Sequence, residues 1–328
     1  MPATHPQPRL GRRFRSIVVP LDGSRLSEQA IPLAMAIAER ARAALRLILV
    51  SIRRLPVSPI PPLSAELRRL YVSLDLEART SEKAYLRAFA AQLKKRSGSV
   101  AVTSRILTGS VAATLLEYVH DTRSDLVVMT SRGQGGVRRL WLGSVADAMI
   151  RGSSVPVLLV RPEENPSPQP ILENLRQILV PVDGSALSEA ILEPAKELAF
   201  LAGAELMLVE VVQPLASPLE SRSAAASRFD LELTDTRRRQ AVDYLKAVAE
   251  RCLQAGVKST YSAPLGVNPA DTILELAESS AIGLIAMATH GRGGIKRLAL
   301  GSVADKLVRT APRPMLVYRP PGRSKGRK

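Results

Sequence analysis

The sequence predicts an α/β fold made of two tandem open parallel sheets, each with five strands flanked by helices. The first observation is a duplication: VPLDGSRLSE begins at Val19, and VPVDGSALSE begins 161 residues later at Val180. A second pair of matching segments begins at Gly133 and Gly291, 158 residues apart, so the repeated unit has the size of a domain. The second observation is that each copy alternates strand-like and helix-like segments, as βαβ units do.

In the first copy, apolar or alternating runs predict strands, and longer segments with helical spacing predict helices between them. The run LVVM within the fourth strand is apolar throughout, as expected for a sheet covered on both faces. Four prolines in residues 55–63 indicate a loop. We expect strands at 15–21, 45–52, 100–107, 125–130 and 155–161, and helices at 26–43, 65–95, 112–120 and 144–151.

The second copy repeats this order. We expect strands at 177–182, 205–212, 257–262, 283–288 and 315–319, and helices at 187–201, 270–279 and 303–309. A long segment that ends at about residue 255 contains the remaining helix. Between the copies, PEENPSPQ has three prolines and no apolar face, which predicts a linker. The predicted organisation is a basic tail (1–13), domain 1 (14–161), the linker (162–174), domain 2 (175–320) and a second basic tail (321–328).

The composition narrows the class of protein. The net charge of +16 predicts either salt-sensitive, non-specific attraction to polyanions such as nucleic acid or simply a solvated surface. Aromatic residues are only 3%, which disfavours a single-strand nucleic-acid binder. Cys252 is the only cysteine, which excludes an intrachain disulfide and favours the cytoplasm. No apolar run approaches the roughly 20 residues of a membrane span, and we expect neither a signal peptide nor a membrane partner.

Each copy carries a glycine-rich loop directly after its fourth predicted strand. In the first copy, Gly133 and Gly136 precede a Gly143-Ser144 pair that opens a predicted helix. The second copy repeats the pattern at the same spacing with Gly291, Gly294, Gly301 and Ser302. Glycines let backbone N–H groups approach a phosphate, and a helix N-terminus favours an anion. The sequence matches neither the P-loop pattern nor the dinucleotide fingerprint.

A capping box is the alternative interpretation of each Gly-Ser pair. Ser144 and Asp147 have the spacing of such a box, and so do Ser302 and Asp305. We favour an anion site, because the glycine loop and the Gly-Ser pair recur together in both copies.

Asp22 and Asp183 directly follow the first strand of each copy. In an open parallel sheet, ligands bind at the carboxyl ends of the strands, near the switch between strands one and four. Each aspartate could therefore accept hydrogen bonds from a ligand. A turn or helix-cap role is an equally good interpretation.

The VPxDGSxxSE start, the long second helix and MATHGRGGIKRLALGSVAD followed by PMLVYRP resemble the universal stress protein family. The resemblance covers both copies. Nucleotide-binding members carry the pattern G-x-x-G, nine residues, then G-[S/T]. Here Thr130 and Ala288 replace the first glycine, and the histidine that commonly precedes the second is kept as His290 but is Arg132 in the first copy.

The resemblance implies a Rossmann-like fold of the adenine nucleotide alpha hydrolase type, with ATP in each copy and any Mg²⁺ carried by the nucleotide. The adenine would lie near the aspartate and the second strand, and the phosphates at the glycine loop and helix start. The matching residues of the second copy are Pro181, Asp183, Val211, Met287, Ala288, His290, Gly291, Gly294, Gly301, Ser302 and Val303. Those of the first are Pro20, Asp22, Ile52, Met129, Arg132, Gly133, Gly136, Gly143, Ser144 and Val145. We expect the tighter site in the second copy, because Ala288 is smaller than Thr130.

These features predict an ATP-binding stress regulator without catalytic residues. A nucleotide-free interaction scaffold and a weak ATPase are the alternatives, and no metal site or protein partner is identified. We also expect pseudo-twofold pairing of the two domains through the last strands, 155–161 and 314–319, because bare edge strands aggregate. A homodimer is a further possible assembly.

Overall fold

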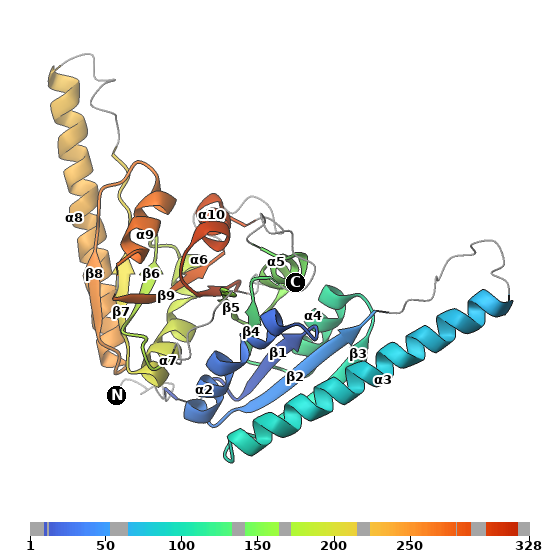
Figure 1. Cartoon of the computed structure of the whole chain (residues 1–328). Coiled ribbons are helices and arrows are strands. Elements are labelled where there is room, and N and C mark those ends of the chain that lie inside the picture. The colour runs from blue at the N-terminus through green and yellow to red at the C-terminus, as the bar shows by residue number, and fades with distance from the viewer. Residues whose placement is uncertain are drawn as a thin grey trace, which may run out of the picture. The chain divides into compact units, whose positions relative to one another are not determined.

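The computed structural model describes residues 10–11, 13–52, 65–132, 142–163, 172–214, 224–279, 281–289 and 300–320. The chain forms two compact units. One is Phe14–Pro166, here called domain 1; the other is Ser167–Lys328 with the segment Met1–Arg13, here called domain 2. Each unit is an α/β domain (Figure 1).

Domain 1 alternates strands and helices along the chain, as the sequence predicts. Its described residues form, in order, β1 (Ser16–Leu21), α1 (Arg25–Glu28), α2 (Ile31–Ala41), β2 (Ala44–Ser51), α3 (Ala65–Arg96), β3 (Val102–Thr108), α4 (Val111–Asp121), β4 (Leu126–Thr130), α5 (Ser144–Gly152) and β5 (Val157–Val160).

Domain 2 repeats the same series of elements. They are β6 (Gln177–Pro181), α6 (Ala186–Glu189), α7 (Leu192–Ala202), β7 (Glu205–Val209), α8 (Ala224–Gln254), β8 (Ser259–Ser262), α9 (Pro269–Ala277), β9 (Ile282–Ala288), α10 (Ser302–Thr310) and β10 (Met315–Tyr318).

The strands of each domain form a parallel sheet. The strand order is β3-β2-β1-β4-β5 in domain 1 and β8-β7-β6-β9-β10 in domain 2, with parallel pairing at each step. Chain order therefore reverses between β1 and β4, and between β6 and β9. The predicted fold class, with two five-stranded parallel sheets, is confirmed.

Helices cover both faces of each sheet. In domain 1, α2 packs on β1 and β2, α3 packs on β2 and β3, and α4 packs against α5. Right-handed crossovers place α2 and α3 on one face and α4 and α5 on the other. With both faces covered, the strands are apolar: all five residues of β4 are buried, and so are all four of β5. The switch between β1 and β4 is where such folds bind ligands.

The first helical region of each domain differs from the prediction. We expected one helix over residues 26–43 and one over 187–201, but the structure divides each into a four-residue turn and an 11-residue helix. Pro32 stands at the start of α2, and Pro194 is near the start of α7. Proline has no N–H to donate, so it fits the first turn of a new helix and cannot continue the earlier one.

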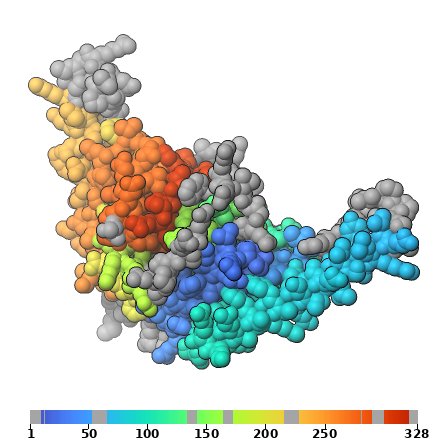
Figure 2. Space-filling model, viewed as in Figure 1, coloured from blue at the N-terminus to red at the C-terminus, as the bar shows by residue number. Residues whose placement is uncertain are grey.

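A tyrosine on the long helix ties it to the first turn in both domains. The Tyr85 hydroxyl donates to Glu28 at 2.8 Å, and the Tyr244 hydroxyl donates to Glu189 at 2.9 Å. Burial and the adjacent carboxylate raise the pKa of both phenols. Figure 2 shows that the first turns of α3 project from domain 1. The Tyr85 hydrogen bond ties a later turn of the helix to α1.

Tyr85→Phe should lower the free energy of unfolding of domain 1 by about 1 kcal/mol, because it leaves a half-buried carboxylate without that donor. Tyr71→Phe is the matched control, since Tyr71 lies on the same helix with 38% of its surface exposed. Urea unfolding checks both variants. Equal stability of the two variants would show that the Tyr85 contact contributes nothing.

The end of the N-terminal segment contacts domain 2. The carboxylate of Glu197 on α7 accepts the backbone N–H of Gly11 at 3.0 Å and that of Arg13 at 2.9 Å. Glu197 is only 1% exposed. A buried carboxylate needs such donors, so residues 11 and 13 form part of the packing of domain 2. The domain limits and the pairing of the two domains remain predictions.

Candidate functional site

The Asp-Gly-Ser segment of domain 1 forms a tight turn at the carboxyl end of β1. Asp22 Oδ1 accepts the N–H of Ser24 at 3.0 Å and its hydroxyl at 2.6 Å. Ser24 in turn caps α1, because its Oγ accepts the N–H of Ser27 at 3.2 Å. Gly23 has φ of 81°, a left-handed conformation that glycine adopts without strain. Asp22 therefore has the turn-forming role that the sequence left open.

Domain 2 builds the same turn. Asp183 Oδ1 accepts the N–H of Ser185 at 3.0 Å and its hydroxyl at 2.6 Å, and Gly184 has φ of 77°. In both domains the turn lies beside the end of the fourth strand, because Val18 pairs with Val127 in domain 1 and Leu179 with Ile285 in domain 2. The Asp turn and the start of the glycine loop thus share one edge of the sheet.

The helices after the glycine loops begin at the Gly-Ser pairs. The cap residues are Gly143 for α5 (φ −76°, ψ 154°) and Gly301 for α10 (φ −61°, ψ 153°), and neither helix has a side-chain cap. Ser144 and Ser302 are the first helical residues. The N–H groups of a first helical turn have no partner within the helix, so these two starts carry partial positive charge.

The capping-box interpretation of the Gly-Ser pairs is wrong. A capping serine must stand before the helix, whereas glycine holds that place in both domains. The aspartates of the proposed boxes bond elsewhere: Asp147 accepts from Arg151 Nε at 2.9 Å, and Asp305 accepts from Arg309 Nε at 3.0 Å. Both helix starts therefore lack the side chain that would replace a ligand.

Neither backbone strain nor close packing against described atoms requires glycine at the cap position. The φ and ψ angles of Gly143 and Gly301 suit any residue. Among the atoms that the structure describes, an added Cβ would come no nearer than 3.4 Å, to the carbonyl oxygen of Ser131 in domain 1 or of Thr289 in domain 2. That distance is ordinary contact. The small residue therefore leaves space in front of the helix start, as close approach of a ligand requires.

The donors at this site can be assigned. The Gly143 N–H donates to the Ser131 carbonyl at 2.7 Å, and the Gly301 N–H donates to the Thr289 carbonyl at 3.0 Å. The groups left to face an anion are then the N–H groups of the first helical residues. Ser131 is fully buried, and its Oγ has no hydrogen-bond partner in the described parts of the chain. A buried hydroxyl beside the helix start is a further polar group available to a ligand.

The two domains differ where the family pattern has its first glycine. The hydroxyl of Thr130 is buried and donates to the carbonyl of Arg132 at 2.7 Å. Ala288 holds the same position in domain 2 and cannot make that bond. The start of the loop in domain 1 is thus tied back to its own backbone by a branched side chain.

Domain 1 also brings together two arginines that the sequence separates. Thr130 on β4 pairs with Val160 on β5, so Arg132 and Arg161 follow adjacent strand ends. Burial, and then the charge of Arg132, lower the pKa of Arg161 to about 10. A nearby like charge disfavours the charged form, so an anion bound close to both guanidinium groups would offset this repulsion. Sequence reasoning missed Arg161, whose one signal was its place directly after the last strand.

The remaining predicted site residues lie as follows. Pro20 is the penultimate residue of β1, Pro181 is the last residue of β6, and both are half-buried. Met129 and Met287 are each 6% exposed and pack in the core. Ile52, after β2, is 63% exposed, whereas Val211 is half-buried. Five predicted residues fall outside the described residues: Gly133, Gly136, His290, Gly291 and Gly294.

Other kinds of site find no support in the described residues. They contain no group of three or more His, Cys, Asp or Glu side chains arranged to hold a metal ion. Cys252 is buried, and burial raises the pKa of its thiol, so it is not a reactive thiolate. No helix in the described ranges is long and apolar enough to cross a membrane.

Each domain is a doubly wound α/β domain with an uncapped helix start at its switch point. Folds of this class bind ligands at the switch point, and a helix N-terminus favours an anionic group. Comparison with known proteins makes the class specific. The model of the universal stress protein family matches residues 13–161 and 174–319. This chain therefore belongs to the universal stress protein family, with two family domains in tandem.

Individual relatives agree with this assignment. A universal stress protein of Mycobacterium tuberculosis is 28% identical over 324 residues, covering 93% of this chain and 95% of the relative. One from Methanocaldococcus jannaschii is 34% identical over 150 residues, covering 45% of this chain and 85% of the relative. The crystal structure of a universal stress protein from Archaeoglobus fulgidus has the same fold, with a TM-score of 0.64 at 18% identity over 93% of this chain and 98% of that one.

Proposed function

We propose that this chain is a cytoplasmic ATP-binding stress protein, in which bound nucleotide controls the choice of protein partner. The observation that carries the proposal is the pair of uncapped Gly-Ser helix starts. In each domain the start lacks a side-chain cap, and no described atom comes nearer than 3.4 Å to a Cβ added at the cap glycine. Both domains keep this uncapped Gly-Ser helix start, here called the nucleotide cradle, and its retention in both copies supports a phosphate ligand.

The site residues divide by the part of the nucleotide that they would hold. The phosphates would meet the glycine loop and the N–H groups of Ser302 and Val303 in domain 2, or of Ser144 and Val145 in domain 1. The adenine and ribose would lie toward the Asp turn and the end of the second strand, near Val211 or Ile52. Bound ATP supplies the negative charge, and any Mg²⁺ would come with it.

The proposal assigns binding and no catalysis. Among the described residues, His120 is the only histidine, and it lies on the surface at the end of α4, where it pairs with the neighbouring Asp121. Nothing in these residues joins a base to a nucleophile or to a positioned water. A nucleotide then acts by differential affinity for two states of the protein.

A nucleotide-free scaffold is the second candidate, and one observation favours it for domain 1. There Thr130 fills the position of the first glycine and bonds to the loop backbone. A domain whose loop is held in this way could keep the fold and lose the ligand.

Calorimetric titration of the full chain with ATP tests the proposed function. We expect saturable binding, weaker binding of AMP because fewer phosphate charges reach the helix start, and no release of phosphate on incubation. Absence of saturable ATP binding would leave the scaffold as the better description. Steady phosphate release would instead assign an ATPase.

Substitutions at Thr130 and Ala288 should change the relative ATP affinity of the two domains. Thr130→Ala removes the bond to the Arg132 carbonyl and should tighten ATP binding to domain 1 by about fivefold, whereas Ala288→Thr should weaken domain 2 by a similar factor. Titration calorimetry of both variants checks this. If ATP affinity were unchanged in both variants, the residue at the first glycine position would not determine the relative strength of the two sites.

A further inference from the structure

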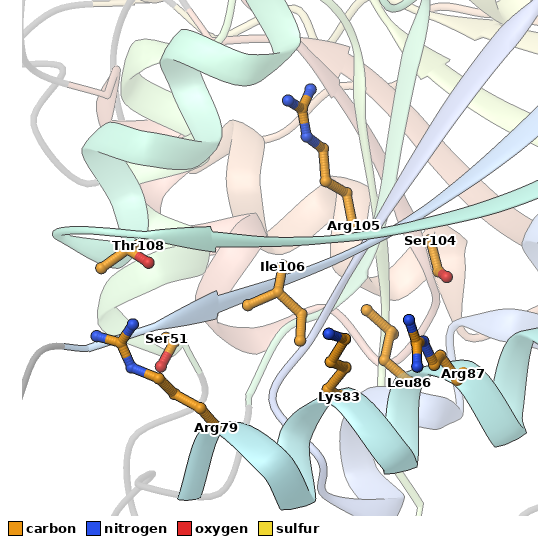
Figure 3. Close-up of a pocket in the computed structure, with 9 residues that line it drawn as sticks. All are labelled: Ser51, Arg79, Lys83, Leu86, Arg87, Ser104, Arg105, Ile106 and Thr108. Carbon is orange, nitrogen blue, oxygen red and sulfur yellow. The ribbon is translucent and has the colours of Figure 1, made fainter. Parts of the chain in front are cut away.

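Domain 1 contains a pocket that lies apart from the nucleotide cradle. It has a volume of about 430 Å³ and lies between the long helix α3 and the strands β2 and β3 (Figure 3). In the strand order β3-β2-β1-β4, these two strands form the edge of the sheet, whereas the cradle lies at β1 and β4. The pocket is therefore a separate site within the same domain.

One wall of the pocket is a row of cations on α3. Arg79, Lys83 and Arg87 are four residues apart, so they share one face of the helix. Figure 3 shows all three side chains directed from the helix toward the strands. Arg79 pairs with Asp75 at 2.8 Å. Within the described ranges, Lys83 and Arg87 form no ion pair.

The opposite wall supplies hydroxyl groups. Ser51 at the end of β2, and Ser104 and Thr108 on β3, line the pocket across from the cations. Leu86 and Ile106 form an apolar part of the lining. Arg105 also borders the pocket, but its side chain points away from α3 (Figure 3). No carboxylate is among the described lining residues, so within these residues the charges of Lys83 and Arg87 are not balanced in the pocket.

We infer that this pocket binds a small molecule carrying two or more phosphate charges. Two cations without a carboxylate partner call for a ligand with more than one negative charge, and hydroxyl groups complete the hydrogen bonding of phosphate oxygens. The volume suits a small molecule and exceeds what a single phosphate fills. The described lining residues include no aromatic side chain on which a nucleic-acid base could stack.

The duplicated domain differs from domain 1 at the centre of the cation row and at the facing strands. The Tyr85–Glu28 and Tyr244–Glu189 bonds align α3 with α8, which places Val242 where domain 1 has Lys83. The strand registers align Ser104 with Tyr261. By the same alignments, the hydroxyl residues Ser51 and Thr108 correspond to Val212 and Leu265. By the same helix alignment, Arg238 and Lys246 stand where domain 1 has Arg79 and Arg87. Domain 2 therefore keeps the two outer cations, but it lacks the central lysine and the three hydroxyl residues of the facing strands.

Calorimetric titration of the full chain with inorganic pyrophosphate at low ionic strength tests the inference. Lys83→Val copies the residue of domain 2 and should weaken pyrophosphate binding about tenfold, because it removes the central charge-assisted contact. Lys95→Val is the matched control: it makes the same change in the last turn of α3, outside the pocket, and should bind like the wild type. If Lys83→Val and Lys95→Val lost the same pyrophosphate affinity, the loss would reflect the lower net charge of the protein, and the inference would be overturned.

Ser104→Tyr gives a second test that alters no charge. Ser104 is exposed, so the variant should fold, and the tyrosine of domain 2 would fill the pocket and produce a similar loss. ATP binding should be unchanged in both pocket variants, which separates this inference from the proposed function. Pyrophosphate binding that is absent in the wild type, or unchanged in both Lys83→Val and Ser104→Tyr, overturns it. The inference would also be overturned if the full chain bound oligonucleotides in a Lys83-dependent way but did not bind pyrophosphate.

Discussion

Gly301→Val is expected to weaken ATP binding to domain 2 by about 100-fold while the domain stays folded. Gly301 is the cap residue of α10, and its own N–H is already bonded to Thr289. It contributes space, so a branched side chain would displace phosphate from the N–H groups behind it. Titration calorimetry measures the loss, and circular dichroism checks the fold.

Gly301→Ala and Gly98→Val are the controls for this result. An added Cβ at Gly301 lies 3.4 Å from the nearest described atom, so alanine should leave stability unchanged and reduce affinity less than valine. Gly98 has no described atom within 4 Å of an added Cβ, so valine there should alter neither property. Gly143→Val should remove the weaker site of domain 1. Full ATP affinity in Gly301→Val would mean that phosphate does not bind at this helix start.

Glu197→Ala should lower the free energy of unfolding of domain 2 by about 2 kcal/mol. The carboxylate is buried and accepts two backbone N–H groups, and hydrogen bonds to a charged group contribute more than neutral ones. Losing it leaves Gly11 and Arg13 without their acceptor. Urea unfolding followed by circular dichroism gives the measurement.

Two matched changes isolate this contact. Glu193→Ala, on the same helix, removes a carboxylate whose side chain is 43% exposed and which pairs with Lys196, and it should cost less than about 0.5 kcal/mol. Deletion of residues 1–13 should destabilise domain 2 like Glu197→Ala, whereas deletion of residues 1–9 keeps Gly11 and Arg13 and should not. If both deletions gave the wild-type transition, the segment would be a tail without a structural role.

Local patterns in the sequence predicted most of the fold. The apolar runs located the strands, and the duplication gave two domains whose elements match one for one. The split of the first helix was missed, although Pro32 and Pro194 were visible, because proline at a helix start and proline within a helix look alike in a sequence. The capping-box spacing also misled, because spacing does not show whether serine or glycine stands at the cap.

Contacts between distant residues could not be predicted in this way. Glu197 meets Gly11 across 186 residues of sequence, and no local pattern marks either partner. Arg161 joins Arg132 only because β5 pairs with β4. The row Arg79, Lys83 and Arg87 could be read from the sequence, but its meaning depends on the hydroxyl groups of β2 and β3 that face it.

Native mass spectrometry of the full chain with ATP most directly tests whether both helix starts hold nucleotide. We predict species with zero, one and two ATP molecules for the wild type, at most one for Gly143→Val or Gly301→Val, and none for the double variant. Gly301→Val should lose the species that forms at the lower ATP concentration. Bound ATP that persists in the double variant, or a wild type that stays free of ATP at excess nucleotide, would contradict the account.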